Sequence, residues 1–161
     1  GGGVFTYQNL TTYNQNVSQI QLGECSGGLT VKTLNFTNWD EENRTMITPF
    51  DFHGTFIYWL GGGSIYKNFS ISNTNITSQT ICILPSNLTY YSDAQIQYEK
   101  SAYVKRNYYL INTTLTNETQ YLKLFSLLTA SSTTFILEVI DEAQIPVAGA
   151  YLYIQRYYAG V

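Results

Sequence analysis

The chain has 161 residues and a net charge of −3, with 12% charged and 16% aromatic residues. This composition excludes a disordered chain, which needs high charge and few aromatics. The net negative charge gives no excess of Lys and Arg that would bind nucleic acid or an anionic membrane. No apolar run approaches the roughly 20 residues of a membrane span. We therefore expect a globular protein with no nucleic-acid partner and no direct membrane insertion.

Residues 1–24 are expected to form an N-terminal arm of one or two strands, around 4–7 and 17–22. Their apolar residues are sparse, so the arm would gain stability by pairing with the edge of a sheet. The sequence leaves open whether that edge is its own or belongs to a neighbouring molecule.

Residues 25–130 repeat the period of two that half-buried strands produce, which predicts one domain. The alternation is clearest at 93–99, where Ala94, Ile96 and Tyr98 are expected to face inward. The segment 55–60 lacks a polar face, which predicts a central strand covered on both sides. The predicted strands are 29–37, 55–60, 64–71, 79–84, 93–99, 103–115 and 120–128. Short strands separated by turn residues are typical of an all-β, antiparallel, immunoglobulin-like β-sandwich, here with extra N-terminal and C-terminal strands.

Residues 131–161 are expected to contain the opening strands of a second β-module. Two strand patterns within 133–158 flank a turn, and residues 139–150 read V-x-D-x(4)-P-V-x-G-A. The residues of this pattern are Val139, Asp141, Pro146, Val147, Gly149 and Ala150.

This strand–turn–strand resembles the carboxypeptidase-regulatory-like or transthyretin-like family of small secreted β-sandwiches. The Asn-rich and Tyr-rich composition is also similar to that of archaeal surface proteins. The resemblance covers less than a fifth of the chain and implies a structural spacer without catalytic residues. Ala143-Gln144 stands where the family often has a glycine. Because the family needs further strands, we expect more sequence or another chain to complete the module.

Asn-X-Ser/Thr sequons, the acceptor sites for N-glycosylation, are far more frequent than chance predicts. They include nine of the 13 asparagines, although Ser and Thr make up only about one residue in five. A Thr-rich β-protein acquires some sequons by accident, but the whole set favours N-linked glycans and hence a location outside the cytoplasm. The candidate sites are Asn9, Asn16, Asn35, Asn43, Asn68, Asn75, Asn87, Asn112 and Asn117.

The two cysteines, Cys25 and Cys82, are consistent with the same compartment. In an oxidising setting they are most simply one disulfide, and the alternative is two buried free thiols. The 15 tyrosines allow two interpretations. They are either partly buried cross-strand pairs or an exposed contact surface, for which Tyr151, Tyr153 and Tyr157 are the candidates.

The sequence contains few residues in an arrangement typical of a catalytic site. His53 is the one histidine and is expected in a loop as a structural residue, which disfavours a Ser/His/Asp triad. Asp40-Glu41-Glu42 is expected in a turn as solubilising charges rather than as paired carboxylates or calcium ligands. We expect no metal and no cofactor.

These observations predict an extracellular or cell-surface structural protein that is not an enzyme. It would be a subunit of a filament, fibre or layer, with copies of itself and N-linked glycans as partners, assembled by strand addition. The alternative hypothesis is an adhesin or receptor-binding module on a cell or virion surface. An extracellular enzyme ranks third.

Overall fold

The computed structural model describes residues 19–61, 65–133 and 136–150. The chain divides into two units, Gly1–Ser131 and Ser132–Val161. In the described part of the first unit the elements are β1 (Gln21–Glu24), β2 (Val31–Asp40), β3 (Phe50–Leu60), β4 (Lys67–Ile76), β5 (Gln79–Leu84), β6 (Tyr90–Glu99), β7 (Arg106–Leu115), β8 (Gln120–Ser126) and a short 3-10 helix, η1 (Thr129–Ser131).

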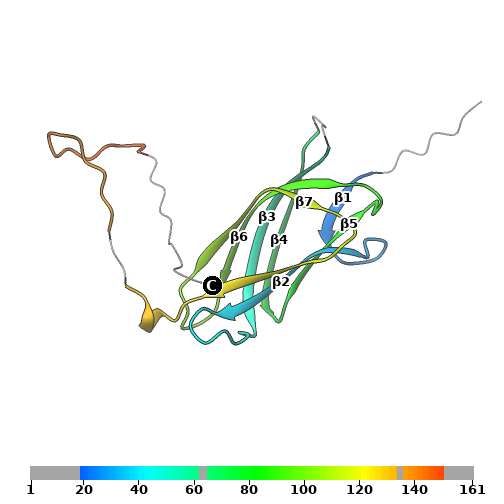
Figure 1. Ribbon diagram of the computed structural model, residues 1–161, viewed down its shortest axis with the longest axis horizontal. Helices are drawn as coiled ribbons and strands as arrows, with labels where there is room; N and C mark the ends of the chain where they lie inside the picture. Colours follow the sequence, from blue (N-terminus) through cyan, green and yellow to red (C-terminus); the bar gives the residue numbers. More distant parts are fainter. Residues whose placement is uncertain (1–18, 62–64, 134–135, 151–161) are drawn as a thin grey trace, which may run out of the picture. The chain divides into compact units, whose positions relative to one another are not determined.

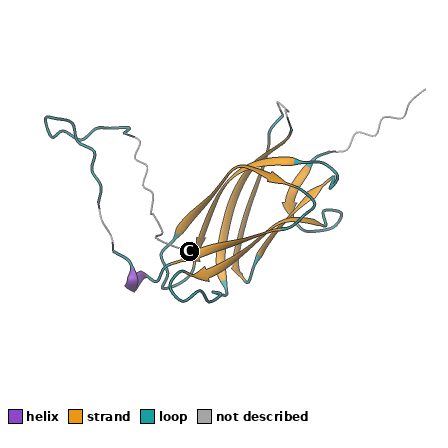
Figure 2. Ribbon diagram, viewed as in Figure 1, coloured by secondary structure: helices purple, strands orange, loops and turns teal. Residues whose placement is uncertain are grey.

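The strands form two four-stranded sheets that pack against each other (Figure 2). The first sheet has the order β1-β5-β2-β8, and the second has the order β4-β3-β6-β7. The second sheet follows the connectivity of one sheet of immunoglobulin variable domains. The predicted all-β sandwich is confirmed, with one departure from antiparallel pairing. β8, the yellow strand beside β2 in Figure 1, runs parallel to β2.

The core lies between the two sheets and is built by the alternation of side chains along each strand. On β3, Phe50, Phe52, Phe56 and Tyr58 are buried, while the alternate residues Asp51, His53, Thr55 and Ile57 are more exposed. Phe52 faces Phe36 of β2 with their ring centroids 5.2 Å apart, so this pair joins the two layers. The predicted inward residues of β6 are confirmed as buried.

Two strand predictions are corrected. The segment 55–60 is central in its sheet but is covered on one face only, because the side chain of Ile57 is 42% exposed. His53 lies within β3 and not in a loop, and its Nδ1 is 2.8 Å from Ser72 Oγ on β4. The strand begins at Phe50 because Phe50 and Phe52 continue the buried face.

The predicted arm ends earlier than expected. Its last four residues form β1, which pairs antiparallel with β5 of the same first sheet. β1 is also tied to the second sheet, because Asn73 Nδ2 donates to Glu24 Oε1 (2.8 Å) and Lys67 Nζ donates to the carbonyl of Ile20 (3.0 Å). The predicted strand at 4–7 lies outside the described residues.

Residues 136–150 contain turns and one isolated bridge but no strand, whereas a strand pattern was expected on the N-terminal side of the turn. One antiparallel bridge joins Ile140 to Pro146, and Asp141 Oδ1 accepts the N–H groups of Ala143 and Ile145. The flanking side chain of Ile136 is 91% exposed. Two paired segments alone are marginal in water, and no strand of the described residues pairs with this turn.

The burial of Tyr90 predicts that the sandwich loses stability at alkaline pH. Its ring is fully buried and its hydroxyl donates to the carbonyl of Pro85 (3.0 Å). Burial, with a smaller contribution from Tyr58, raises the pKa of Tyr90 to about 12. Because an unfolded tyrosine ionises near 10, the stabilisation is complete below about pH 10 and is lost as the pH rises towards 12.

We therefore expect the free energy of unfolding, measured with denaturant, to fall between about pH 10 and 12. In Tyr90→Phe this alkaline fall should be smaller, since the variant has no proton to lose at this position. Equal falls in both proteins would contradict the assignment.

Candidate functional site

The sequons are distributed unevenly over the sandwich. Seven of the nine predicted sites lie in the described residues, whereas Asn9 and Asn16 lie outside them. Six of the seven are exposed: Asn43, Asn68, Asn75, Asn87, Asn112 and Asn117. Asn35 on β2 differs, because it is half-buried and its Oδ1 is buried without a hydrogen-bond partner.

The two sheets differ in the sequons that their strands contain. In the second sheet, β4 contains Asn68 and Asn75, and β7 contains Asn112. In the first sheet, the described strands contain Asn35 alone. Asn43, Asn87 and Asn117 lie in the connections after β2, β5 and β7.

An aspartate holds the backbone of three sequon asparagines in the same way. The N–H of Asn75 donates to Asp51 Oδ1 (2.8 Å), and the N–H of Asn112 donates to Asp93 Oδ1 (2.6 Å). The N–H of Asn43 donates to Asp40 Oδ1 (3.1 Å). These three carboxylates therefore fix the positions from which the sequon side chains project.

At two of these positions the backbone conformation also favours asparagine. Asn75 and Asn112 have φ values of 56° and 47°, and each lies where the pairing register with the neighbouring strand shifts. Asparagine adopts this left-handed region more readily than most residues do. Nothing in the sequence near these asparagines indicates the aspartate partner.

Asp40 and Glu41 correct the interpretation of 40–42 as solubilising charges, because both residues are buried. The N–H of Asn43 lowers the pKa of Asp40, assisted by the N–H of Glu42 and the hydroxyl of Tyr103, which donates to Oδ2 (3.0 Å). Glu41 forms an ion pair with Arg106 (2.6 Å). These contacts therefore close the loop after β2: Asp40 binds backbone and hydroxyl donors, and Glu41 pairs with Arg106 of β7.

The outer face of the second sheet exposes a row of aromatic rings, which we call the aromatic row. It consists of Tyr66, Trp59 and Tyr91, with ring centroids 5.2 Å apart for the first two and 6.3 Å apart for the last two. Further along the same sheet, Ile57, Tyr109 and Ile111 line a shallow groove of about 440 Å³. A more polar groove of about 400 Å³ includes His53, Ser72 and Gln97.

The outer face of the first sheet has two contacts between a cation and an aromatic ring. Lys123 Nζ lies 4.0 Å above the ring of Trp39, and the guanidinium of Arg44 lies 4.9 Å from the ring centre of Phe125. Tyr121 on β8 is 77% exposed. β8 is an edge strand, paired in the described structure with β2 alone.

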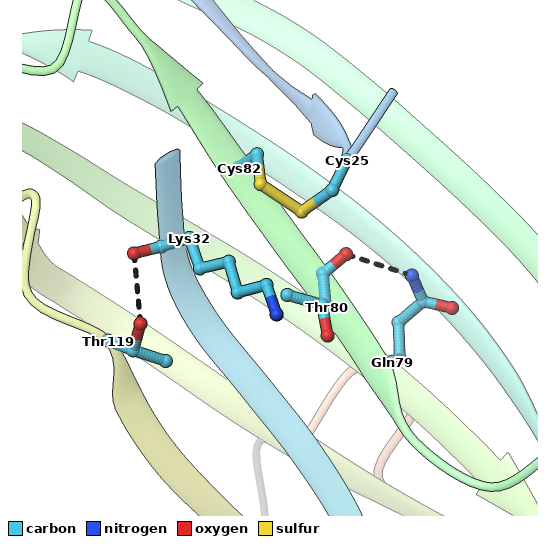
Figure 3. The surroundings of a disulfide bond; sticks show 6 residues. All are labelled: Cys25, Lys32, Gln79, Thr80, Cys82 and Thr119. Atoms are coloured by element: carbon cyan, nitrogen blue, oxygen red, sulfur yellow. Dashed lines mark hydrogen bonds between the residues drawn. A yellow bond between two sulfur atoms is a disulfide. The ribbon is translucent and has the colours of Figure 1, made fainter. Parts of the chain in front are cut away.

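The predicted disulfide is confirmed. Cys25 follows β1 and bonds to the fully buried Cys82 of β5, with their Cα atoms 5.0 Å apart (Figure 3). The bond joins two strands of the first sheet that already pair through Gly23 and Cys82. A disulfide indicates that the protein folds in an oxidising compartment.

The remaining predicted surface, Tyr151, Tyr153 and Tyr157, lies outside the described residues. In the described ranges no three His, Cys, Asp or Glu side chains form a group able to hold a metal ion. No helix in those ranges is long and apolar enough to cross a membrane.

The molecule is thus a disulfide-bonded all-β sandwich whose second sheet is rich in exposed sequons. No family model, curated protein or solved structure matches the chain.

Proposed function

We propose that the chain is an N-glycosylated extracellular structural protein, a subunit of a surface filament, fibre or layer whose copies assemble through β-strand contacts. The observation that supports this most is the asymmetry between the sheets. Three exposed sequons lie on strands of the second sheet, while the strands of the first sheet have only the half-buried Asn35. Glycans are bulky and would shield the second sheet, leaving the first available for contacts.

The edge strand β8 is the proposed contact site. Edge strands present unpaired backbone groups to which another chain can add a strand. At Phe125 the carbonyl of β8 already accepts from Tyr98 and Arg106, so the proposed contact lies nearer the start of the strand, at the exposed Tyr121. Exposed tyrosines are common at protein interfaces. The donor we propose is the N-terminal arm of a second copy, residues 1–18. The bridge between Ile140 and Pro146 supports the further proposal that 133–158 begins a second β-module.

Negative-stain microscopy of the full glycosylated chain tests the proposal. We expect filaments, fibres or sheets from the unaltered protein and discrete particles from Tyr121→Glu, because a carboxylate at the edge opposes burial. Tyr109→Glu is the matched control, since Tyr109 is a 57% exposed tyrosine on the second sheet. Assembly that survives Tyr121→Glu, or discrete particles from the unaltered protein, would contradict the proposal.

The same proposal predicts which sequons are occupied. Tyr121 is the direct neighbour of Asn35 across the β2–β8 pair, so a glycan on Asn35 would cover the proposed contact site. We expect glycopeptide mass spectrometry to find high occupancy at the six exposed described sites and low occupancy at Asn35. High occupancy at Asn35 would argue against the first sheet as the interface.

The groove lined by Ile57, Tyr109 and Ile111 favours the second candidate, an adhesin or receptor-binding module, because exposed apolar surface often marks a binding site. Discrete monomers whose binding to cells is lost on Ile111→Asp, with the thermal midpoint unchanged, would support this alternative over assembly.

A further inference from the structure

The aromatic row lies beside one particular sequon. The Cα partner of Asn68 on β3 is Ile57, and the partner of Trp59 on β6 is Tyr91. Residues two apart on a strand share a face, so Tyr66 precedes Asn68 on the outer face and Trp59 follows Ile57 there. Asn68 therefore stands next to the Tyr66 end of the row.

The exposure of these residues agrees with this placement. Tyr66 is 60% exposed, and Asn68 is exposed between the half-buried Lys67 and Phe69. Among the described residues the Asn68 side chain makes no hydrogen bond, so its amide is not tied down by the fold. This distinguishes Asn68 from Asn43, whose Oδ1 accepts the N–H of Thr45 (2.9 Å).

We propose that the N-glycan on Asn68 folds back over Tyr66 and Trp59, so that these rings form an intramolecular platform for its protein-proximal sugar. This inference rests on the proposed function in that Asn68 must be glycosylated. The aromatic row is then covered by the chain's own modification and is not a site for a separate ligand.

The chemistry of the two surfaces favours this contact. One face of a pyranose ring presents C–H groups, and the faces of Tyr and Trp rings are apolar while their edges retain a polar group. Stacking removes both apolar surfaces from water and leaves the sugar hydroxyls solvated. Attachment at Asn68 makes the contact intramolecular, and such tethering gives an effective concentration on the order of millimolar for a short linker. A free saccharide or a second copy has no such advantage.

Two substitutions outside the platform remove a glycan without changing the aromatic residues, so they measure the effect of the glycan alone. Ser70→Ala removes the sequon at Asn68, and Thr77→Ala removes the sequon at Asn75 on the same strand. Both asparagines and their backbone conformations are retained. Thr77→Ala is therefore the matched control, because it removes a glycan at the end of β4 that is remote from the aromatic row.

Hydroxyl-radical footprinting of the full glycosylated chain, read by mass spectrometry, measures the accessibility of Tyr66. We expect Tyr66 to be oxidised several-fold faster in Ser70→Ala than in the unaltered protein, and at the unaltered rate in Thr77→Ala. Tyr121 serves as the internal reference and should react equally in all three proteins. A thermal double-mutant cycle of Ser70→Ala with Tyr66→Ser should show non-additive losses in Tm, since both changes break one contact.

Each other outcome overturns the inference. An occupied Asn68 with equal oxidation of Tyr66 in Ser70→Ala would show that the glycan does not cover the ring. Protection that persists in Ser70→Ala and increases with protein concentration would assign the platform to a second copy. An empty Asn68 beside occupied Asn75 and Asn117 overturns this inference alone, whereas sequons that are empty throughout also contradict the proposed function.

Discussion

Replacing Cys25 and Cys82 together with alanine is expected to lower the free energy of unfolding by about 4 kcal/mol, because the bond closes a long loop in the unfolded chain. The two cysteines are 57 residues apart. The loss corresponds to a fall in Tm of roughly 10 to 15 °C for a domain of this size. Thermal and denaturant unfolding of the full chain measure it.

Reduction provides the control for this prediction. Adding a thiol reductant to the unaltered protein should produce a similar fall in Tm, and adding it to the double alanine variant should produce none. The region most affected should be β1, which pairs with β5 and is bonded to β4 by only a few polar contacts. A loss below about 1 kcal/mol would show that strand pairing alone holds β1 in place.

Substituting Phe52 by alanine is the second large expected effect, with a loss of about 3 to 5 kcal/mol. The ring is fully buried and contacts Phe36 of the opposite sheet. It also lies over Gly54, where an added Cβ would be 3.0 Å from Phe52 and 2.7 Å from Phe56. Phe52 therefore fills space that Gly54 leaves empty, and two strands of a sheet cannot readily collapse into the cavity.

Ile57→Ala is the matched control on the same strand. Its side chain points away from the core and is 42% exposed, so we expect a loss well under half of that for Phe52→Ala. Urea unfolding at a common pH compares the two variants. Equal losses would mean that the outer face of the second sheet is buried in solution.

The sequence predicted those features that depend on local alternation. β5 has the predicted bounds, Gln79–Leu84, and β6 has the predicted inward residues, because a two-residue period on one strand reports one buried face. The prediction failed at 55–60, where both faces are apolar for different reasons. The inner face joins the core, while Trp59 on the outer face packs against Tyr66 and Tyr91.

Features that depend on distant partners were not predictable from the sequence. From the sequence Asp40 was interpreted as a surface charge, but Tyr103, 63 residues away, donates a hydrogen bond to it. Nothing near Asp51 or Asp93 in the sequence identifies them as acceptors for the N–H groups of sequon asparagines. The sequons themselves were visible, but their segregation onto the second sheet required the strand order. For the same reason, Asn35 could not be distinguished from the exposed sites.

The parallel pair of β2 with β8 determines when the first sheet can be completed. Ser126 Oγ on β8 donates to Asn38 Oδ1 on β2 (2.8 Å), across 88 residues of sequence. Closing so long a loop costs entropy before any contact compensates for it, and contacts between distant residues slow folding. During synthesis β2 therefore stays unpaired on its β8 side until nearly the whole sandwich has left the ribosome. In that interval β2 is the edge of the first sheet and exposes the backbone groups that β8 later pairs with, and an open edge of this kind is prone to pairing with other chains.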